Sequence, residues 1–473
     1  MKLYTSIIII IITFFGCKKD NQDQGKPYAY IGGEIINPNT NFVVLSKDEV
    51  VLDTVKLDGR NRFIYKINDL DEGIYTFRHG GEYQMVLLES RDSILFRLNT
   101  LDFDESLVYT GVGDRKNNYL INDFLENEKE EKHVIKFCQL NPVSYEKHID
   151  SIRNKKVEIF NEFKKKYSTS PLFEKIAKAN IDYTYYSSKE VYPFIHFGKD
   201  KAAILKSVPD GFYDYRKDIN YNDTFFSQFY NYNTFLRHNL SNISLKIHDD
   251  HSDNNDFNRG SICYNLDRLY LIDSLVTNTS IKDDLLHYFT MMYLSKNENI
   301  ESNEAILKSY LGKSKNEKNK QMVSRFTKSL NSLKDGATLP QVFVVNYEGK
   351  EFDINALIKR PTVISFWSHK YYGHFKDSHN KLIELKEKYP ETNFIAVNIN
   401  DYDLDKSKKI LETHGFDFKN EYLFKNPIEA TEMLAIYPMT KTIIIDKNKK
   451  IVKSNSNIFS LNFEEQLLGA INR

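Results

Sequence analysis

The chain has 473 residues, which exceeds the usual size of one domain and predicts two to four domains. Lysine plus arginine and aspartate plus glutamate each number 65, so the formal charge is zero. This balance excludes a nucleic-acid-binding protein that relies on bulk positive charge. Glycine (19) and proline (11) are scarce, which excludes collagen-like and linker-dominated chains. We therefore expect an ordered, multi-domain protein that does not bind nucleic acid.

The N-terminal residues predict an export signal. The apolar run that follows Lys2 is too short to span a bilayer as a permanent helix, and it has the charged start of a secretory signal. Gly16 directly before Cys17 resembles the lipobox of bacterial lipoproteins. This resemblance implies that residues 1–17 are a lipoprotein signal peptide with a lipidated Cys17 at its end, and that residues 18–27 are a polar tether. An ordinary signal peptide or a fixed anchor is the alternative.

Residues 28–112 predict an all-β sandwich. Short apolar or alternating runs are separated by Asn-Pro, Asp-Gly, Glu-Gly and Gly-Gly pairs, which is the spacing of short strands joined by tight turns. The segments Lys56–Tyr75 and Leu87–Phe96 resemble an uncharacterised β-domain that often precedes a thioredoxin module in envelope lipoproteins of Gram-negative bacteria. We find no set of catalytic side chains in this domain.

Residues 113–335 predict an α-helical middle domain, because apolar residues recur there at spacings of three and four over helix-length segments. Cys138 and Cys263 lie in this domain, and they could form a disulfide in an oxidising compartment if their Cα atoms come within about 7 Å. Two buried thiols are the alternative. The segment from His248 to Asp256 is rich in histidine and aspartate but lacks the pattern of a calcium loop, so we expect a solvated loop and no metal site.

Residues 336–473 predict a mixed α/β layer fold, since strand-like and helix-like segments alternate there. The Leu339-Pro340 pair, the Gly349-Lys350 turn, the Phe366-Trp367 pair and the Ile445-Asp446 pair follow in the order seen in the TlpA-like branch of envelope thioredoxins. The sequence resembles that family over this C-terminal segment. The resemblance implies a thioredoxin-like fold.

The same resemblance implies where a redox site would lie. In that family the first cysteine of a CxxC motif stands four positions after the tryptophan, at a helix N-terminus that lowers the thiol pKa. Tyr371 and His374 occupy the two cysteine positions here, and no cysteine follows Cys263. A phenol with a pKa of about 10 is a poor nucleophile at neutral pH and cannot form a disulfide. Thiol chemistry of the family type is therefore excluded at this site.

The family also places a cis-proline opposite the motif, and the corresponding position here is Thr440. Pro438 stands two residues earlier, so either the peptide bond before Thr440 is trans or the loop is shifted to use Pro438. Thioredoxins bind extended peptides on this face. We expect the binding surface to consist of Trp367, Tyr371, Tyr372, His374 and Thr440.

These patterns together predict a redox-inactive thioredoxin-fold lipoprotein of the cell envelope that binds a peptide or protein partner. Its lipid anchor would hold it on the periplasmic side or the cell surface of the outer membrane. We expect no cofactor, no metal ion and no catalytic residue. The alternative is a thiol-disulfide oxidoreductase that uses Cys138 and Cys263, or the thiols of a partner. A hydrolase or metal enzyme built on the segment from His248 to Asp256 is a third hypothesis.

Overall fold

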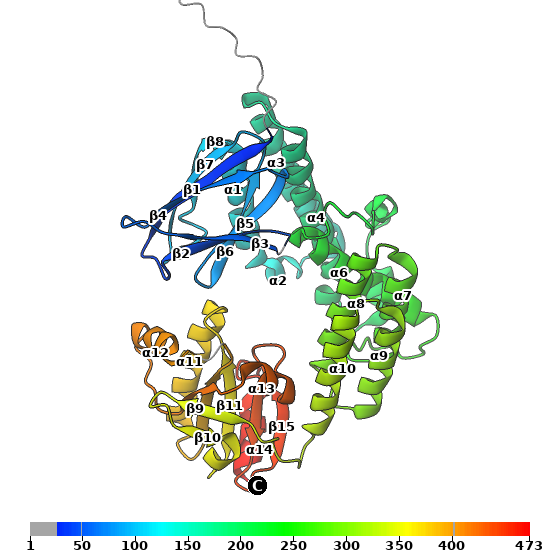
Figure 1. Ribbon diagram of the computed structural model, residues 1–473. Coiled ribbons are helices and arrows are strands. Elements are labelled where there is room, and N and C mark those ends of the chain that lie inside the picture. Colours follow the sequence, from blue (N-terminus) through cyan, green and yellow to red (C-terminus); the bar gives the residue numbers. More distant parts are fainter. Residues whose placement is uncertain (1–25, 49, 401–402) are drawn as a thin grey trace, which may run out of the picture.

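The computed structural model describes residues 26–473 except 49, 401 and 402. The predicted signal peptide, Cys17 and most of the predicted tether lie outside these residues. Figure 1 shows β-sheets in the N-terminal part, long helices in the middle and a mixed sheet in the C-terminal part. Within the described residues, no helix has both the length and the apolar character needed to cross a membrane.

The N-terminal part is a sandwich of two four-stranded sheets, with strand orders β4-β1-β7-β8 and β3-β2-β5-β6. The strands are β1 (Tyr28–Ile36), β2 (Phe42–Lys47), β3 (Val50–Lys56), β4 (Arg62–Asn68), β5 (Gly73–His79), β6 (Glu82–Leu88), β7 (Ser93–Asn99) and β8 (Val108–Val112). Alternate side chains face the core between the sheets, where Phe77 stacks on Phe96 with ring centroids 4.3 Å apart. The turn between β5 and β6 is formed by Gly80 and Gly81.

The middle part is helical. Its helices are α1 (Asp114–Glu131), α2 (Val134–Phe137), α3 (Pro142–Lys166), α4 (Pro171–His196), α5 (Lys201–Lys206), η1 (Asp214–Asp218), α6 (Tyr230–Asp249), α7 (Ile262–Leu275), α8 (Thr279–Leu294), α9 (Ile300–Lys313) and α10 (Glu317–Ser332). The two longest helices of the described residues, α3 and α4, begin alike, with a side-chain cap followed by proline. The Asn141 side chain accepts from the Ser144 N–H at α3, and Ser170 accepts from the Phe173 N–H at α4. Such caps satisfy N–H groups that a helix leaves unpaired.

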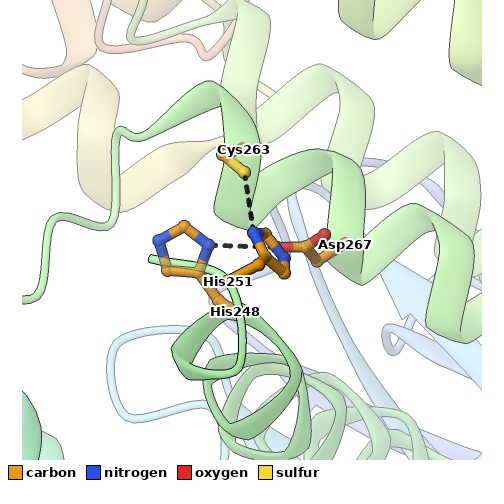
Figure 2. Close-up of side chains that lie close together, drawn as sticks. All are labelled: His248, His251, Cys263 and Asp267. Atoms are coloured by element: carbon orange, nitrogen blue, oxygen red, sulfur yellow. Dashed lines mark hydrogen bonds and ion pairs between the residues drawn. The ribbon is translucent and has the colours of Figure 1, made fainter. Parts of the chain in front are cut away.

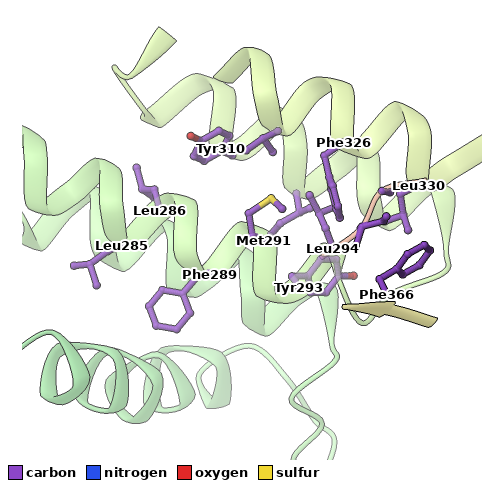
Figure 3. Close-up of a cluster of buried hydrophobic side chains, with 14 of the residues drawn as sticks. Leu285, Leu286, Phe289, Met291, Tyr293, Leu294, Tyr310, Phe326, Leu330 and Phe366 are labelled. Carbon is purple, nitrogen blue, oxygen red and sulfur yellow. The ribbon is translucent and has the colours of Figure 1, made fainter. Parts of the chain in front are cut away.

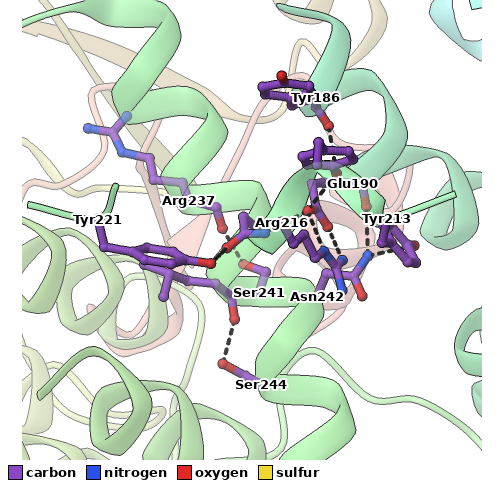
Figure 4. A network of polar contacts seen from close by, with 12 residues as sticks. Tyr186, Glu190, Tyr213, Arg216, Tyr221, Arg237, Ser241, Asn242 and Ser244 are labelled. Atoms are coloured by element: carbon purple, nitrogen blue, oxygen red, sulfur yellow. Dashed lines mark hydrogen bonds and ion pairs between the residues drawn. The ribbon is translucent and has the colours of Figure 1, made fainter. Parts of the chain in front are cut away.

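A buried carboxylate connects α4, α6 and η1, as Figure 4 shows. Glu190 is 0% exposed and accepts hydrogen bonds from the Tyr215 hydroxyl (2.7 Å), Arg216 Nε (2.9 Å) and Asn239 Nδ2 (2.6 Å). Arg216 Nη2 is a further donor to the same carboxylate. Four donors satisfy a charge that would otherwise be costly to bury. Aromatic rings surround this network, and Tyr186 stacks on Tyr215 at 4.2 Å.

The C-terminal part is a seven-stranded sheet of order β10-β9-β13-β12-β11-β14-β15. Its elements are β9 (Phe343–Asn346), β10 (Glu351–Asp353), η2 (Ile354–Leu357), β11 (Thr362–Trp367), α11 (Tyr372–Lys388), β12 (Asn393–Asn398), α12 (Leu404–Thr413), β13 (Glu421–Phe424), α13 (Pro427–Met433), β14 (Thr442–Ile445), β15 (Ile451–Ser456) and α14 (Phe463–Ile471). The central strand β11 pairs in parallel with β12 and antiparallel with β14. The parallel β11-α11-β12 unit and the antiparallel β14-β15 hairpin form the mixed α/β fold predicted for residues 336–473.

All six residues of β11 are buried, because the strand is central in the sheet and covered on both faces. Phe366 belongs to the large hydrophobic cluster that also contains residues of α8 and α10. Figure 3 shows Phe366 beside Leu330 and Tyr293. Trp367 points to the opposite face and packs in a second cluster with Phe375. The helical part therefore packs directly against one face of the C-terminal sheet.

Candidate functional site

The candidate site lies where β11 ends and α11 begins. The Tyr371 N–H donates to the Ser368 carbonyl at 3.1 Å, which closes a tight turn after the strand. Tyr371 is the N-cap residue of α11, and His374 lies in the first turn of the helix. The two residues at the predicted cysteine positions therefore do stand at a helix N-terminus.

Two tyrosines dominate the exposed part of this site. Tyr371 is 58% exposed and Tyr372 is 37% exposed, and the Tyr372 hydroxyl lies 3.0 Å from Nε2 of His414. His374 is half-buried, and this burial lowers its pKa, as does the nearby charge of His379. A neutral His374 agrees with its place at the positive end of the α11 dipole.

The predicted surface role of Trp367 is wrong. Trp367 is 1% exposed, and its ring packs on Phe375 with centroids 4.9 Å apart. The physical reason is that both side-chain directions of a central, doubly covered strand point into a core. Trp367 supports the site from beneath and offers no surface to a ligand.

The loop before β14 lies opposite the start of α11. The Tyr437–Pro438 peptide bond is cis, so the loop uses Pro438, and Thr440 does not occupy the cis-proline position that the resemblance assigned to it. The Lys441 N–H donates to the Pro438 carbonyl at 3.0 Å, which closes a turn that takes up the two extra residues. Thr440 is half-buried. Ser365 pairs with Thr442 in the antiparallel β11-β14 ladder, so the residues before β14 lie beside the residues that follow β11. Burial raises the pKa of Tyr437, and Tyr371 adds to this rise.

A buried acid lies beneath the site and was missed by the sequence analysis. Glu421 is 3% exposed, and it accepts a hydrogen bond from Trp367 Nε1 at 3.1 Å. Its other carboxylate oxygen lies 3.4 Å from Nε2 of His379, whose Nδ1 donates to the Phe375 carbonyl at 2.7 Å. Burial raises the pKa of Glu421, while His379 and Trp367 oppose the rise. No sequence pattern signals this arrangement, because the partners come from three separate elements.

The helical part and the N-terminal sandwich both border this site. On the α10 side, Arg325 pairs with Glu432 at 3.0 Å, and the Phe326 ring lies 6.3 Å from the Tyr437 ring. On the sandwich side, a Cβ added to Gly81 would lie 2.9 Å from the His369 carbonyl oxygen. The β5-β6 turn therefore lies directly against the loop that precedes Tyr371.

The described cysteines are both free thiols in the helical part. Cys138 is fully buried in a cluster with Tyr145 and Tyr192, and burial raises its pKa to about 11. Cys263 is half-buried on α7, where burial and the charge of Asp267 raise its pKa. Neither environment produces a reactive thiolate, and the disulfide considered from the sequence is not formed.

No family model matches the sequence, and no curated protein matches it. Among solved structures, the chain is similar to the thioredoxin domain of a thiol-disulfide oxidoreductase from Bacteroides vulgatus, with 16% identity, a TM-score of 0.25 and coverage of 30% of this chain and 97% of that one. It is also similar to a thiol:disulfide interchange protein from Bacteroides sp., with 17% identity, a TM-score of 0.23 and coverage of 26% and 85%. An uncharacterised thioredoxin-like protein from Porphyromonas gingivalis shows 23% identity, a TM-score of 0.23 and coverage of 28% and 89%. These matches are to thioredoxin-like proteins, over less than a third of this chain.

Proposed function

We propose that the protein is a redox-inactive, thioredoxin-fold binding protein of the cell envelope that holds a peptide or protein partner at the start of α11. The main support for the proposal is the identity of the two residues at the N-terminus of α11. An exposed phenol at Tyr371 and a half-buried imidazole at His374 stand where electron transfer would need two sulfurs. Such a site can bind a chain but cannot exchange a disulfide with it.

The surface has properties that suit an extended polypeptide. Tyr371 offers an amphipathic ring, and exposed tyrosines contribute strongly to protein interfaces. No side chain of the described residues caps α11, so its first N–H groups are free to donate to a carbonyl oxygen of a partner. The Pro438 loop runs beside the end of β11, because Ser365 pairs with Thr442 in the sheet, so the loop supplies a second backbone segment next to the surface that would hold a peptide.

The proposal includes a lipid anchor at Cys17, which rests on the Gly16-Cys17 pair and the apolar run before it. Two or three acyl chains hold a protein stably on a membrane, whereas one is marginal. The anchor would place the protein on the periplasmic side or the cell surface of the outer membrane. The oxidoreductase alternative gains no support, because both described thiols have raised pKa values.

Binding of an unfolded polypeptide to the ectodomain tests the proposal. The probe is fluorescently labelled α-lactalbumin, reduced and carboxymethylated, titrated by fluorescence anisotropy. We expect Tyr371→Ala to weaken binding about thirtyfold, because an interface hot spot contributes about 2 kcal/mol. Tyr270→Ala is the matched control, because Tyr270 is a 64% exposed tyrosine on α7. Equal affinities of the two variants would refute the proposed binding site.

A further inference from the structure

Four potential metal ligands converge between α6 and α7, away from the thioredoxin-like surface. His248 lies in the last turn of α6, and His251 follows just beyond the end of the helix. Cys263 and Asp267 lie four residues apart on α7, so they share one face of that helix. Figure 2 shows the four side chains pointing toward one another.

The distances within this cluster are close to those of a tetrahedral site. One Asp267 oxygen lies 3.0 Å from His248 Nδ1 and 3.1 Å from His251 Nε2, and Cys263 Sγ lies 3.7 Å from His251 Nδ1. One ligand atom from each residue can be chosen so that all four lie within 4.8 Å of one another. Zinc bonds of about 2.0 Å to nitrogen or oxygen and about 2.3 Å to sulfur require ligand atoms roughly 3.3 to 3.6 Å apart. His251 faces Asp267 with Nε2 and Cys263 with Nδ1, and only one of these nitrogens can bind the metal, so the imidazole must turn and the ligands must close in to complete the tetrahedron.

We propose that His248, His251, Cys263 and Asp267 bind a zinc ion. A thiolate with two imidazoles selects a borderline metal and disfavours Mg²⁺ and Ca²⁺. With Cys263 and Asp267 both ionised, the two negative charges balance Zn²⁺, so the loaded site is neutral. Zinc binding displaces the thiol proton of Cys263 into solvent. Four protein ligands fill the coordination sphere, which is typical of a structural site that here holds the 250–261 loop against α7.

Metal titration of the metal-free ectodomain tests this proposal. We expect one equivalent of Zn²⁺ to bind and to raise the Tm, with no effect of Mg²⁺ at the same concentration. Co²⁺ should bind in the same place and show the near-ultraviolet charge-transfer absorption of a thiolate ligand. Cys263→Ser should abolish that absorption and weaken Zn²⁺ binding about tenfold or more. His251→Ala should weaken Zn²⁺ binding similarly.

Cys138→Ser is the matched control, because Cys138 is the other described thiol and lies outside the cluster. It should keep both the Co²⁺ absorption and the Zn²⁺ affinity of the wild-type protein. Absence of Zn²⁺ binding to the wild-type protein would overturn the proposal. So would a Co²⁺ absorption that survives in Cys263→Ser.

A second, independent feature lies on the neighbouring face of α7. A cavity of about 400 Å³ is lined by residues of α4, α6, α7 and α8, and three arginines reach it: Arg237, Arg259 and Arg268. Among the described residues that line the cavity, Glu190 carries the only carboxylate, and it is already bound by Arg216 and its other donors. The cavity is therefore strongly cationic.

Arg268 is the most unusual of these arginines. It is 8% exposed and stacks on Phe289 at 4.0 Å, while Nη1 donates to Ser241 Oγ at 3.4 Å and Nη2 donates to Asn265 Oδ1. Within the described part of the chain, its Nε has no hydrogen-bond partner and no carboxylate pairs with it. Arg237 stacks on Tyr288 at 3.9 Å, and its Nε is likewise unpartnered among the described residues. Burial of a cation without a nearby anion lowers the stability of the folded protein, so a buried and unpaired arginine is rare.

We infer that this cavity binds a small organic anion that carries a carboxylate or phosphate group. A guanidinium presents paired donors that match either group, and the guanidinium side chains of Arg237, Arg259 and Arg268 line this cavity. Tyr288 and Phe289 form apolar walls suited to the uncharged part of the ligand. The inference does not depend on what the start of α11 binds.

Thermal unfolding with two probes tests the inference. Phenyl phosphate and benzoate, each at millimolar concentration, represent the phosphate and carboxylate cases. We expect at least one probe to raise the Tm of the wild-type protein and of the control Arg78→Met, whose arginine is exposed and stacks on Tyr83 in the sandwich. Arg268→Met should lose this rise and should be more stable than the wild-type protein without ligand. No rise with either probe, or an equal rise in Arg268→Met, would contradict the inference.

Discussion

Lys441 is a buried amine in the loop that carries Pro438, and its burial gives a quantitative prediction. Lys441 is 2% exposed, and Nζ donates to the Ala435 carbonyl at 2.9 Å. Among the described residues no carboxylate forms an ion pair with it, and burial alone lowers its pKa from 10.5 to about 7. We predict that Lys441→Met stabilises the C-terminal part at neutral pH.

The magnitude follows from the linkage between protonation and folding. The unfolded chain binds a proton at Lys441 up to pH 10.5, but the folded protein releases it above about pH 7. Wild-type stability therefore rises with pH between these two values, by about 2 kcal/mol from pH 7 to pH 9. Near pH 7 the burial of Lys441 lowers the stability of the wild-type protein by on the order of 4 kcal/mol. The Lys441→Met variant removes this cost but loses the hydrogen bond to Ala435, which is worth about 1 kcal/mol. A net gain of about 3 kcal/mol is expected for Lys441→Met at pH 7.

The assay uses the single tryptophan of the chain. Trp367 is buried in the C-terminal sheet, so its fluorescence during urea unfolding reports on the part that contains Lys441. The stability gain of Lys441→Met over the wild type should shrink by about 2 kcal/mol between pH 7 and pH 9. Lys447→Met, at an exposed position after β14, should change little at either pH. A gain that is equal at pH 7 and pH 9 would refute the reasoning.

Three further predictions concern other parts of the chain. Arg216→Met should destabilise the helical part by about 3 to 5 kcal/mol, because it leaves Glu190 buried without its cation. Unfolding followed by circular dichroism measures this, and an effect below about 1 kcal/mol would contradict the prediction. The ectodomain should reduce insulin or glutathione disulfides no faster than background, and turnover that is lost on Cys138→Ser would end the binding-protein proposal. Cys17→Ala should leave the protein unprocessed or free of the membrane after cell fractionation, and unchanged membrane partition would argue against lipidation.

The order of strands and helices in the C-terminal part can be predicted from the sequence, because each element depends on the pattern of residues within its own short segment. The sequence predicts a helix from about Gly373 to Lys388, which corresponds to α11 (Tyr372–Lys388), and a strand in the run KTIIID, which contains β14. The Gly-Gly pairs show where local signals fail. Gly80 and Gly81 form a turn, whereas Gly32 and Gly33 lie inside β1, where a Cβ at residue 32 would meet the Phe63 carbonyl at 2.6 Å. Only the neighbouring strands distinguish the two cases.

The candidate site was predictable only where it depends on position along the chain. Counting from Trp367 correctly places Tyr371 and His374 at the start of a helix, because the strand and helix are consecutive. Counting cannot show that Trp367 is buried or that Glu421 lies beneath it, since both depend on strand pairing. The pairing of His251 with Cys263 was equally hidden, because the histidine and aspartate segment meets α7 only in the folded chain.

The contact between Gly81 and the His369 loop has a consequence for how tightly any partner is held. The hairpin tip approaches so closely that even a methyl group at residue 81 would crowd the His369 carbonyl. A long chain lying across Tyr371 would have to compete with that tip for space. Its measured affinity would then equal the intrinsic affinity multiplied by the fraction of molecules whose hairpin has swung away. The sandwich would thus compete with the partner for this site, and only a partner with sufficient intrinsic affinity would bind.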